Sequence, residues 1–180
     1  MKDLFGQYCR DQFPALDRQL DGQPVVYLDG PAGTQVPRCV IEAIGDYLGN
    51  RNANHGGLFL TSVESDEMLA RAHQALADLL GVEDAGEIIF GPNMTSLTFS
   101  LSRALGQTWQ EGDEVIVTRL DHDANVAPWV LAARDAGATV HHVDIHPEDC
   151  TLDLEDLKSK LSDRTRLVAV GSASNGSGTI

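Results

Sequence analysis

The stretch that decides the fold is Glu111-Gly-Asp-Glu-Val-Ile-Val-Thr-Arg-Leu-Asp-His-Asp-Ala-Asn-Val-Ala-Pro-Trp129. It reads as a turn, a fully apolar strand over residues 115–117, a polar loop, and an amphipathic helix that carries Trp129. His122 lies with two aspartates and an asparagine just past the carboxyl end of this strand. Because ligands bind at that edge of open parallel α/β sheets, His122 is a candidate ligand contact.

Short apolar runs alternate with helical patterns on both sides of this stretch. This alternation predicts an α/β fold with a largely parallel sheet that helices cover on both faces. Residues 1–24 are expected to form an N-terminal arm and residues 25–180 a single domain. The other predicted strands are 25–28, 87–90, 139–143 and 166–170, and the predicted helices begin at Pro37, near 63, near 94, before Trp129 and at 153.

Composition excludes several classes of function. The chain has 180 residues with 13 basic and 27 acidic side chains, a net charge of −14, so it offers no basic footprint for nucleic acid or an anionic membrane surface. No apolar run approaches the length of a membrane span, and the N-terminus has no signal-peptide pattern. Cys9, Cys39 and Cys150 lie far apart and have no metal-ligand spacing. We therefore expect a cytoplasmic protein without a metal site.

Two further turns that follow predicted strands carry polar groups. In residues 90–96, the helix N-terminus and the hydroxyls of Thr95 and Ser96 can hold a phosphate. The alternative for this turn is an ordinary helix N-cap by Asn93. Asn175 lies in the turn after the last predicted strand. Three polar turns at one edge of a sheet define a site better than any one of them does.

The remaining polar residues have structural interpretations. His122 has the alternative of an exposed loop histidine beside acids, and Asp121 and Asp123 are interpreted as solvated or capping residues. The lysines are interpreted as structural, because one is terminal and two lie near a helix end, where positive charge suits the helix dipole. They are Lys2, Lys158 and Lys160.

Five segments, in order, resemble the class V aminotransferase group, specifically its cysteine desulfurase-like branch, which uses pyridoxal phosphate (PLP). Each segment is moderately specific, and their order and spacing make the resemblance strong over residues 27–180. The segments are Tyr27-Leu-Asp-Gly-Pro-Ala-Gly-Thr-Gln-Val-Pro37, Asn52-Ala-Asn54, the turn after Phe90, residues 112–129, and Leu167-Val-Ala-Val with Ser174-Asn-Gly-Ser-Gly-Thr179.

The resemblance implies a fold type I PLP enzyme, with a mixed sheet in a large α/β domain, a smaller C-terminal domain and a homodimer. Met94 and Thr95 would hold the cofactor phosphate. His122 would be catalytic and stack on the pyridine ring, and Asn175 would lie beside the 3′ oxygen of the ring. A small amino acid would be the substrate. The flat imidazole suits the pyridine ring, the helix N-terminus suits the phosphate, and the amide donor suits the ring oxygen.

The chain also departs from the family pattern. Typical desulfurases carry Gly-Thr-Thr where this chain has residues 93–95, and a His-Arg pair where it has Gly56-Gly57. The second change puts cysteine as the substrate in doubt. Cysteine desulfuration remains the leading reaction, with transamination, β-lyase action and racemisation left open.

The last predicted strand has no helix after it, and the chain stops at Ile180. We therefore read the sequence as the first part of a longer, truncated domain that lacks the Schiff-base lysine and is inactive alone. The alternative is a catalytically retired homologue that serves as a dimeric binding or scaffold protein. A third, weaker option is an unrelated α/β domain that binds a phosphorylated small molecule.

Overall fold

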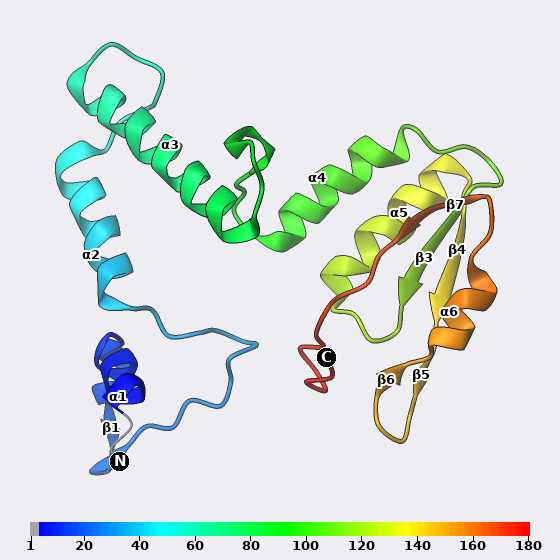
Figure 1. Cartoon of the computed structure of the whole chain (residues 1–180), viewed down its shortest axis with the longest axis horizontal. Helices are drawn as coiled ribbons and strands as arrows, with labels where there is room; N and C mark the ends of the chain where they lie inside the picture. Colours follow the sequence, from blue (N-terminus) through cyan, green and yellow to red (C-terminus); the bar gives the residue numbers. More distant parts are fainter. Residues whose placement is uncertain (1–3) are drawn as a thin grey trace. The chain divides into compact units, whose positions relative to one another are not determined.

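The computed structural model describes residues 4–180, and the chain divides into two compact units, residues 1–89 and residues 90–180 (Figure 1). The division between an N-terminal arm at 1–24 and a domain at 25–180 stays a prediction. Among the described residues, no helix combines the length and apolar character that crossing a membrane requires.

The second unit is built on a parallel sheet of order β4-β3-β7. Its central strand β3, Glu114–Thr118, pairs in parallel with β4, Thr139–Val143, on one side and with β7, Thr165–Val168, on the other. Every residue of β3 is buried. A continuous apolar run suits a strand that is covered on both faces, and the predicted parallel sheet is confirmed.

Helices pack around this sheet. α5, Ala127–Ala136, contacts β3 and β4, and α4, Met94–Gly106, packs on α5, while α6, Leu154–Lys160, contacts β4 (Figure 1). The short turn η4, Asp123–Asn125, precedes α5, and the hairpin of β5, Ile145–His146, and β6, Thr151–Leu152, follows β4. The apolar core lies between α5 and the sheet and is formed by Trp109, Val115, Val117, Trp129, Ala132, Ala133 and Ala169.

The first unit is mostly helical. It contains α1, Leu4–Asp11, η1, Pro14–Asp17, the strand pair β1, Gln19–Leu20, and β2, Gln23–Pro24, then α2, Arg38–Asp46, the π-helical turn η2, Tyr47–Arg51, α3, Leu60–Leu80, and η3, Ala85–Glu87. Within the described part of this unit, the buried apolar side chains are Ala77 and Ile88. Most of its large apolar side chains are exposed.

Several helix boundaries follow from local chemistry that the sequence shows. Gly81 ends α3 with φ +71°, the left-handed conformation that glycine adopts without strain. The Asn93 side chain caps α4 by accepting a hydrogen bond from the Ser96 N–H at 2.9 Å. Pro37 directly precedes α2. Helix ends are therefore predicted well, because caps act through neighbouring residues.

Two predicted strands are wrong. Residues 25–28 are extended coil after β2, and residues 87–90 run from η3 into coil. Their side chains are exposed, 90% for Leu28 and 77% for Ile89. An apolar run becomes a strand only when a neighbour supplies its hydrogen bonds, and among the described residues neither run is paired in a sheet.

The apolar face of α3 is exposed near the end of the helix. Leu79 and Leu80, which the helical period places on that face, are 77% and 68% exposed. The period shows which side chains share a face and not whether another element covers that face.

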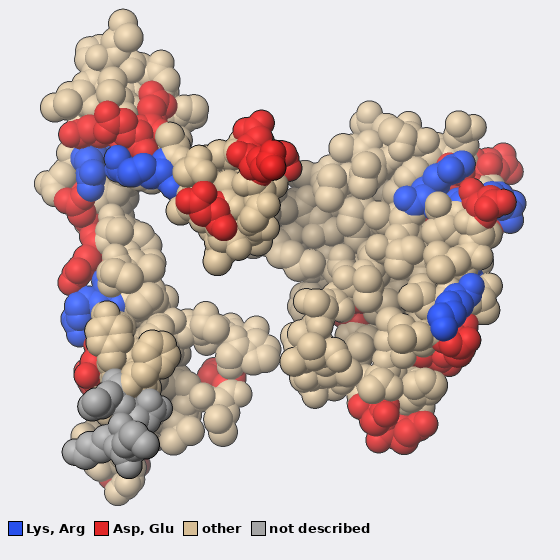
Figure 2. All heavy atoms as spheres, in the orientation of Figure 1, with Lys and Arg blue, Asp and Glu red and all other residues tan. Residues whose placement is uncertain are grey.

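A cluster of charged side chains joins the amino ends of β3 and β7. Arg166 donates to Asp113 at 2.8 Å, and Arg164 donates to Glu114 at 2.8 Å. The Ser162 hydroxyl also donates to Glu114, at 2.6 Å. Both carboxyl groups belong to residues that are 7% exposed. Elsewhere basic side chains also lie beside acidic ones, as Figure 2 shows for one face.

The partners in this cluster lower the pKa of both acids. The backbone N–H of Gln110 and then the guanidinium of Arg166 hold the pKa of Asp113 below its ordinary 3.8. The Ser162 hydroxyl and then Arg164 hold the pKa of Glu114 below its ordinary 4.5. Desolvation opposes these effects without cancelling them. The charged carboxylates therefore stabilise the folded unit.

We expect this stabilisation to depend on pH. Because both pKa values are lowered by folding, it is fully present above the ordinary values of 3.8 and 4.5 and is lost as pH falls through the folded values. Arg166→Gln should lower the thermal midpoint at pH 7 and flatten its decline below pH 4.5, since Asp113 then titrates more nearly as in the unfolded chain.

Thermal unfolding followed by circular dichroism between pH 3 and pH 7 measures this dependence. Arg134→Gln is the matched control, because Arg134 is 72% exposed and reaches Asp135 only at 3.4 Å. Superimposable pH curves for Arg166→Gln and the unmodified chain would show that the Arg166–Asp113 pair contributes nothing.

Candidate functional site

The loops after β3 and β7 meet at the carboxyl edge of the sheet. The Ser174 hydroxyl, in the loop after β7, donates to the carbonyl of Leu120, in the loop after β3, at 3.4 Å. Gly171 lies against the carboxylate of Asp121. Parallel neighbours end at the same edge of a sheet, so the pairing of β3 with β7 brings these two loops together.

His122 occupies the first of these loops as the cap of η4. Its Nδ1 accepts a hydrogen bond from the Ala124 N–H at 3.0 Å. A backbone N–H only donates, so this bond requires a lone pair on Nδ1 and puts the ring proton of the neutral imidazole on Nε2. The side chain is otherwise exposed. The bond fixes the orientation of the ring and leaves its face accessible.

Met94 and Thr95 form the first two positions of α4. The Asn93 cap takes the N–H of Ser96, while the N–H groups of Met94 and Thr95 have no acceptor within residues 4–180. Both residues are exposed. The N-cap and the phosphate interpretations are therefore compatible, because the cap satisfies one donor and leaves two N–H groups and the Thr95 hydroxyl for an anion.

Asn175 lies in a tight turn in the loop after β7. Ser174 organises this turn, because its N–H donates to the Thr179 carbonyl at 2.8 Å and its carbonyl accepts from the Gly178 N–H at 3.0 Å. The Asn175 side chain is exposed and has no hydrogen-bond partner among the described residues. Its amide is available to a ligand.

All four predicted site residues belong to the second unit. Figure 1 shows that α4 and α5 begin on the side of this unit where β3 ends, and α4 contacts η4, which His122 caps. A hollow of about 280 Å³ at this edge is lined by Thr118, Asp121, Gly171 and Ser172 among others. The site residues themselves are exposed and do not line it. Their roles stay predictions.

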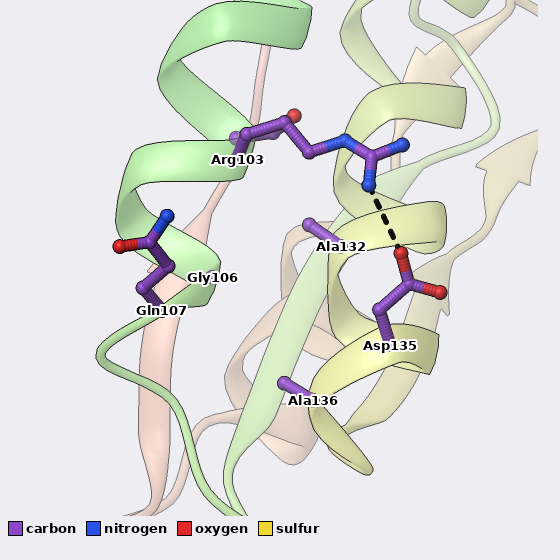
Figure 3. Close-up of a pocket in the computed structure, with 7 residues that line it drawn as sticks. Arg103, Gly106, Gln107, Ala132, Asp135 and Ala136 are labelled. Carbon is purple, nitrogen blue, oxygen red and sulfur yellow. Dashed lines mark hydrogen bonds and ion pairs between the residues drawn. The ribbon is translucent and has the colours of Figure 1, made fainter.

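A different hollow, of about 310 Å³, lies between the last turns of α4 and α5 (Figure 3). Arg103 reaches across from α4 to Asp135 on α5 at 3.1 Å. A Cβ on Gly106 would lie 3.2 Å from the Cβ of Ala132, so the two helices approach closely there. This hollow is at the opposite end of both helices from the polar loops and forms no part of the candidate site.

A hydrogen-bonded network behind His122 was not predicted from sequence. Asp121, interpreted as solvated or capping, instead accepts hydrogen bonds from Thr118 and from the Asn125 amide, and Asn125 accepts one from the Trp129 indole. The sequence feature that could have revealed this network is a spacing. A threonine ends the strand, an acid follows three residues later, an asparagine follows four residues after the acid, and a tryptophan follows four residues after the asparagine.

The loop that departs from the family pattern lies in the first unit. The Gly56 N–H donates to both carboxylate oxygens of Asp66, at 3.0 and 3.1 Å, and the Gly57 N–H donates to the Ser62 hydroxyl at 2.8 Å. Gly56 has φ +81°, and a Cβ on Gly57 would lie 2.8 Å from the Ser62 Oγ. As folded, the loop favours glycine at position 56 because of the positive φ, and at position 57 because a Cβ would press on the Ser62 side chain.

The described residues at the sheet edge fit PLP chemically. Two unpaired N–H groups at a helix start suit its phosphate, an accessible imidazole face suits its ring, and a free amide suits its phenolic oxygen. Of the lysines, Lys158 pairs with Glu155 at 2.6 Å and Lys160 pairs with Asp156, all on α6. Lys2 lies outside the described residues. Neither lysine of α6 belongs to this edge.

Known proteins resemble this chain over nearly its whole length. A probable cysteine desulfurase of Halalkalibacterium halodurans is 33% identical over 170 residues, which are 93% of this chain and 42% of that protein. The crystal structure of the cysteine desulfurase CsdA from Escherichia coli superimposes with a TM-score of 0.76 at 29% identity, covering 94% of this chain and 41% of that one. The chain thus spans about two fifths of the length of such relatives.

A second similar structure carries the cofactor itself. It is a variant of the lyase C-DES with glycine covalently linked to PLP, with a TM-score of 0.69 and 26% identity, covering 88% of this chain and 39% of that one. These likenesses confirm the predicted fold type I architecture and the PLP dependence of the family. The family model for class V aminotransferases matches residues 26–180. The chain therefore belongs to the class V aminotransferase family.

Proposed function

We propose that the protein is a PLP-dependent enzyme of the cysteine desulfurase-like type that acts on a small amino-acid substrate. The observation that carries the proposal is the polar edge of the parallel sheet, where the start of α4, the His122 loop and the Asn175 loop each offer an accessible group suited to PLP. Membership of the family supports the same cofactor. Desulfuration of cysteine is the leading reaction.

The residues of this chain would bind and orient the cofactor. The N–H groups of Met94 and Thr95, with the Thr95 hydroxyl, would hold the phosphate at the positive end of α4. His122 would lie flat on the ring, because Nδ1 is already held by Ala124. The Asn175 amide would donate to the 3′ oxygen. When bound, PLP draws electrons from the substrate's Cα, which is the chemistry that such reactions need.

We propose further that the 180-residue chain alone has no turnover. Covalent PLP chemistry begins from a lysine linkage, and the lysines of α6 are held in ion pairs with acids of the same helix. The second candidate, a retired homologue with a binding or scaffold role, is favoured by the same observation. A lysine just after a strand in the complete gene product would support the enzyme, and its absence would support the scaffold.

We also expect a homodimer in the cytoplasm. The first unit exposes apolar side chains on α2 and at the start of α3, a pattern typical of surfaces that another protein covers. They include Val40, Ile41, Ile44, Leu58, Phe59 and Leu60, and Leu58 is 99% exposed.

The cofactor proposal predicts a spectroscopic result. The protein made from the complete gene and purified with PLP should show an absorbance band in the visible to near-ultraviolet range that borohydride abolishes. A desalted sample should retain one PLP per chain, measured after alkaline release. A protein that shows no band and retains no PLP would overturn the proposed function.

His122→Ala should weaken PLP binding and shift the band, because the flat partner of the ring is lost. Stacking on an aromatic face is worth about 0.5–1.5 kcal/mol, so we expect a loss of affinity of roughly two- to tenfold. Equilibrium dialysis measures it. His146→Ala is the control, since His146 is an exposed histidine of β5, outside the loops of the site. If both variants bind PLP with equal affinity and show identical spectra, His122 is only a surface residue that does not contact PLP.

A further inference from the structure

The carboxylate of Asp121 collects hydrogen bonds from two elements. The Thr118 hydroxyl, at the end of β3, donates to Oδ2, and the Asn125 amide, in η4, donates to Oδ1 at 2.8 Å. The Thr118 Oγ1 in turn accepts from the Asp121 N–H at 3.0 Å. The end of β3 and η4 are therefore both hydrogen-bonded to one carboxylate, and His122 lies in the short loop between these two elements.

The network is anchored in the core at its far end. The Trp129 indole donates to the Asn125 Oδ1 at 3.2 Å, and Trp129 is 5% exposed within the apolar core. Thr118 is 2% exposed. Because both ends are buried, Asn125 has one orientation in which its oxygen faces Trp129 and its amide faces Asp121. The loop has little freedom to rearrange.

The loop after β7 touches the same carboxylate. A Cβ on Gly171 would lie 2.7 Å from the Asp121 Oδ1, closer than non-bonded atoms come. That oxygen is held by Asn125, so it cannot move aside without breaking a hydrogen bond. Gly171 is thus the position where the loop carrying Asn175 fits against the loop carrying His122.

We propose that Asp121 is a positioning residue that fixes the His122 ring and, through its contact with Gly171, couples the His122 loop to the Asn175 loop. The role of the His122 ring in PLP binding rests on the proposed function. The hydrogen bonds that place the ring do not depend on that function. The experiment therefore has one readout on the protein without PLP and one with it.

Nitrogen-15 NMR of histidine-labelled full chain without PLP reports the His122 tautomer, with His122→Gln used to assign the signal. The unmodified chain should show a hydrogen-bonded, unprotonated Nδ1. Asp121→Asn should lose this single-tautomer signature, because the amide has an oxygen at only one of the two positions where the carboxylate accepts. Asp123→Asn is the control, since Asp123 is exposed and its carboxylate has no hydrogen bond among the described residues.

Gly171→Ala tests the contact from the other loop and keeps the proposal falsifiable if Asp121→Asn does not fold. It should disturb the His122 signal in the unmodified chain and add nothing in an Asp121→Ala background, where the clashing oxygen is absent. Gly176→Ala is the control, because its Cβ would lie 3.9 Å from the Ser174 Oγ, an ordinary contact.

The readout with PLP uses the complete gene product. Asp121→Asn and Gly171→Ala should each weaken PLP binding by no more than the roughly two- to tenfold expected for loss of the His122 ring, because both act through the placement of that ring, and the two controls should leave PLP binding unchanged. An unchanged His122 signature in both test variants overturns the proposal. A changed signature in a protein that never binds PLP supports the positioning role and overturns only the proposed function.

Discussion

Everything at the candidate site depends on the burial of β3 between two parallel neighbours. All five residues of the strand are buried, so its register against β4 and β7 is fixed by packing on both faces as well as by hydrogen bonds. Parallel pairing sends every following loop to the same edge. The site is thus a consequence of topology, assembled from residues more than fifty positions apart in the chain, such as Leu120 and Ser174.

The two edges of the sheet have different chemistry. The amino edge pairs Asp113 and Glu114 with arginines from the start of β7, and these pairs hold the β7 strand in place. At the carboxyl edge, the N–H groups of Met94 and Thr95 and the amide of Asn175 have no hydrogen-bond partner among the described residues. Charges that are paired at one edge therefore position groups that remain available at the other, which is what a binding site needs if it is to be ordered before its ligand arrives.

The sequence predicts this second unit better than the first. The strand at 139–143 has the bounds that the structure shows, and the Asn93 cap follows from local chemistry. The Gly81 cap, in the first unit, follows in the same way. Residues 25–28 and 87–90 fail because strand formation depends on a distant partner that an apolar pattern does not reveal. The interpretation of Asp121 as a solvated or capping residue fails for the same reason, because its partners come from other elements of the fold. Its type suggests a solvated acid, and only the positions of Thr118 and Asn125 show otherwise.

The Gly56-Gly57 pair, which stands where typical desulfurases carry His-Arg, also affects the backbone of its loop. The Asp66 carboxylate and the Ser62 hydroxyl hold the backbone of the loop directly, and this arrangement excludes a Cβ at Gly57 and disfavours one at Gly56. In this backbone conformation, a His-Arg pair would put the first residue at a positive φ and the Cβ of the second against the Ser62 side chain. The loop backbone and its two α3 partners, Ser62 and Asp66, therefore act as one hydrogen-bonded unit. The proposed substrate preference therefore depends on the loop over residues 54–57, and the proposed cofactor binding depends on the polar edge of the sheet in the second unit.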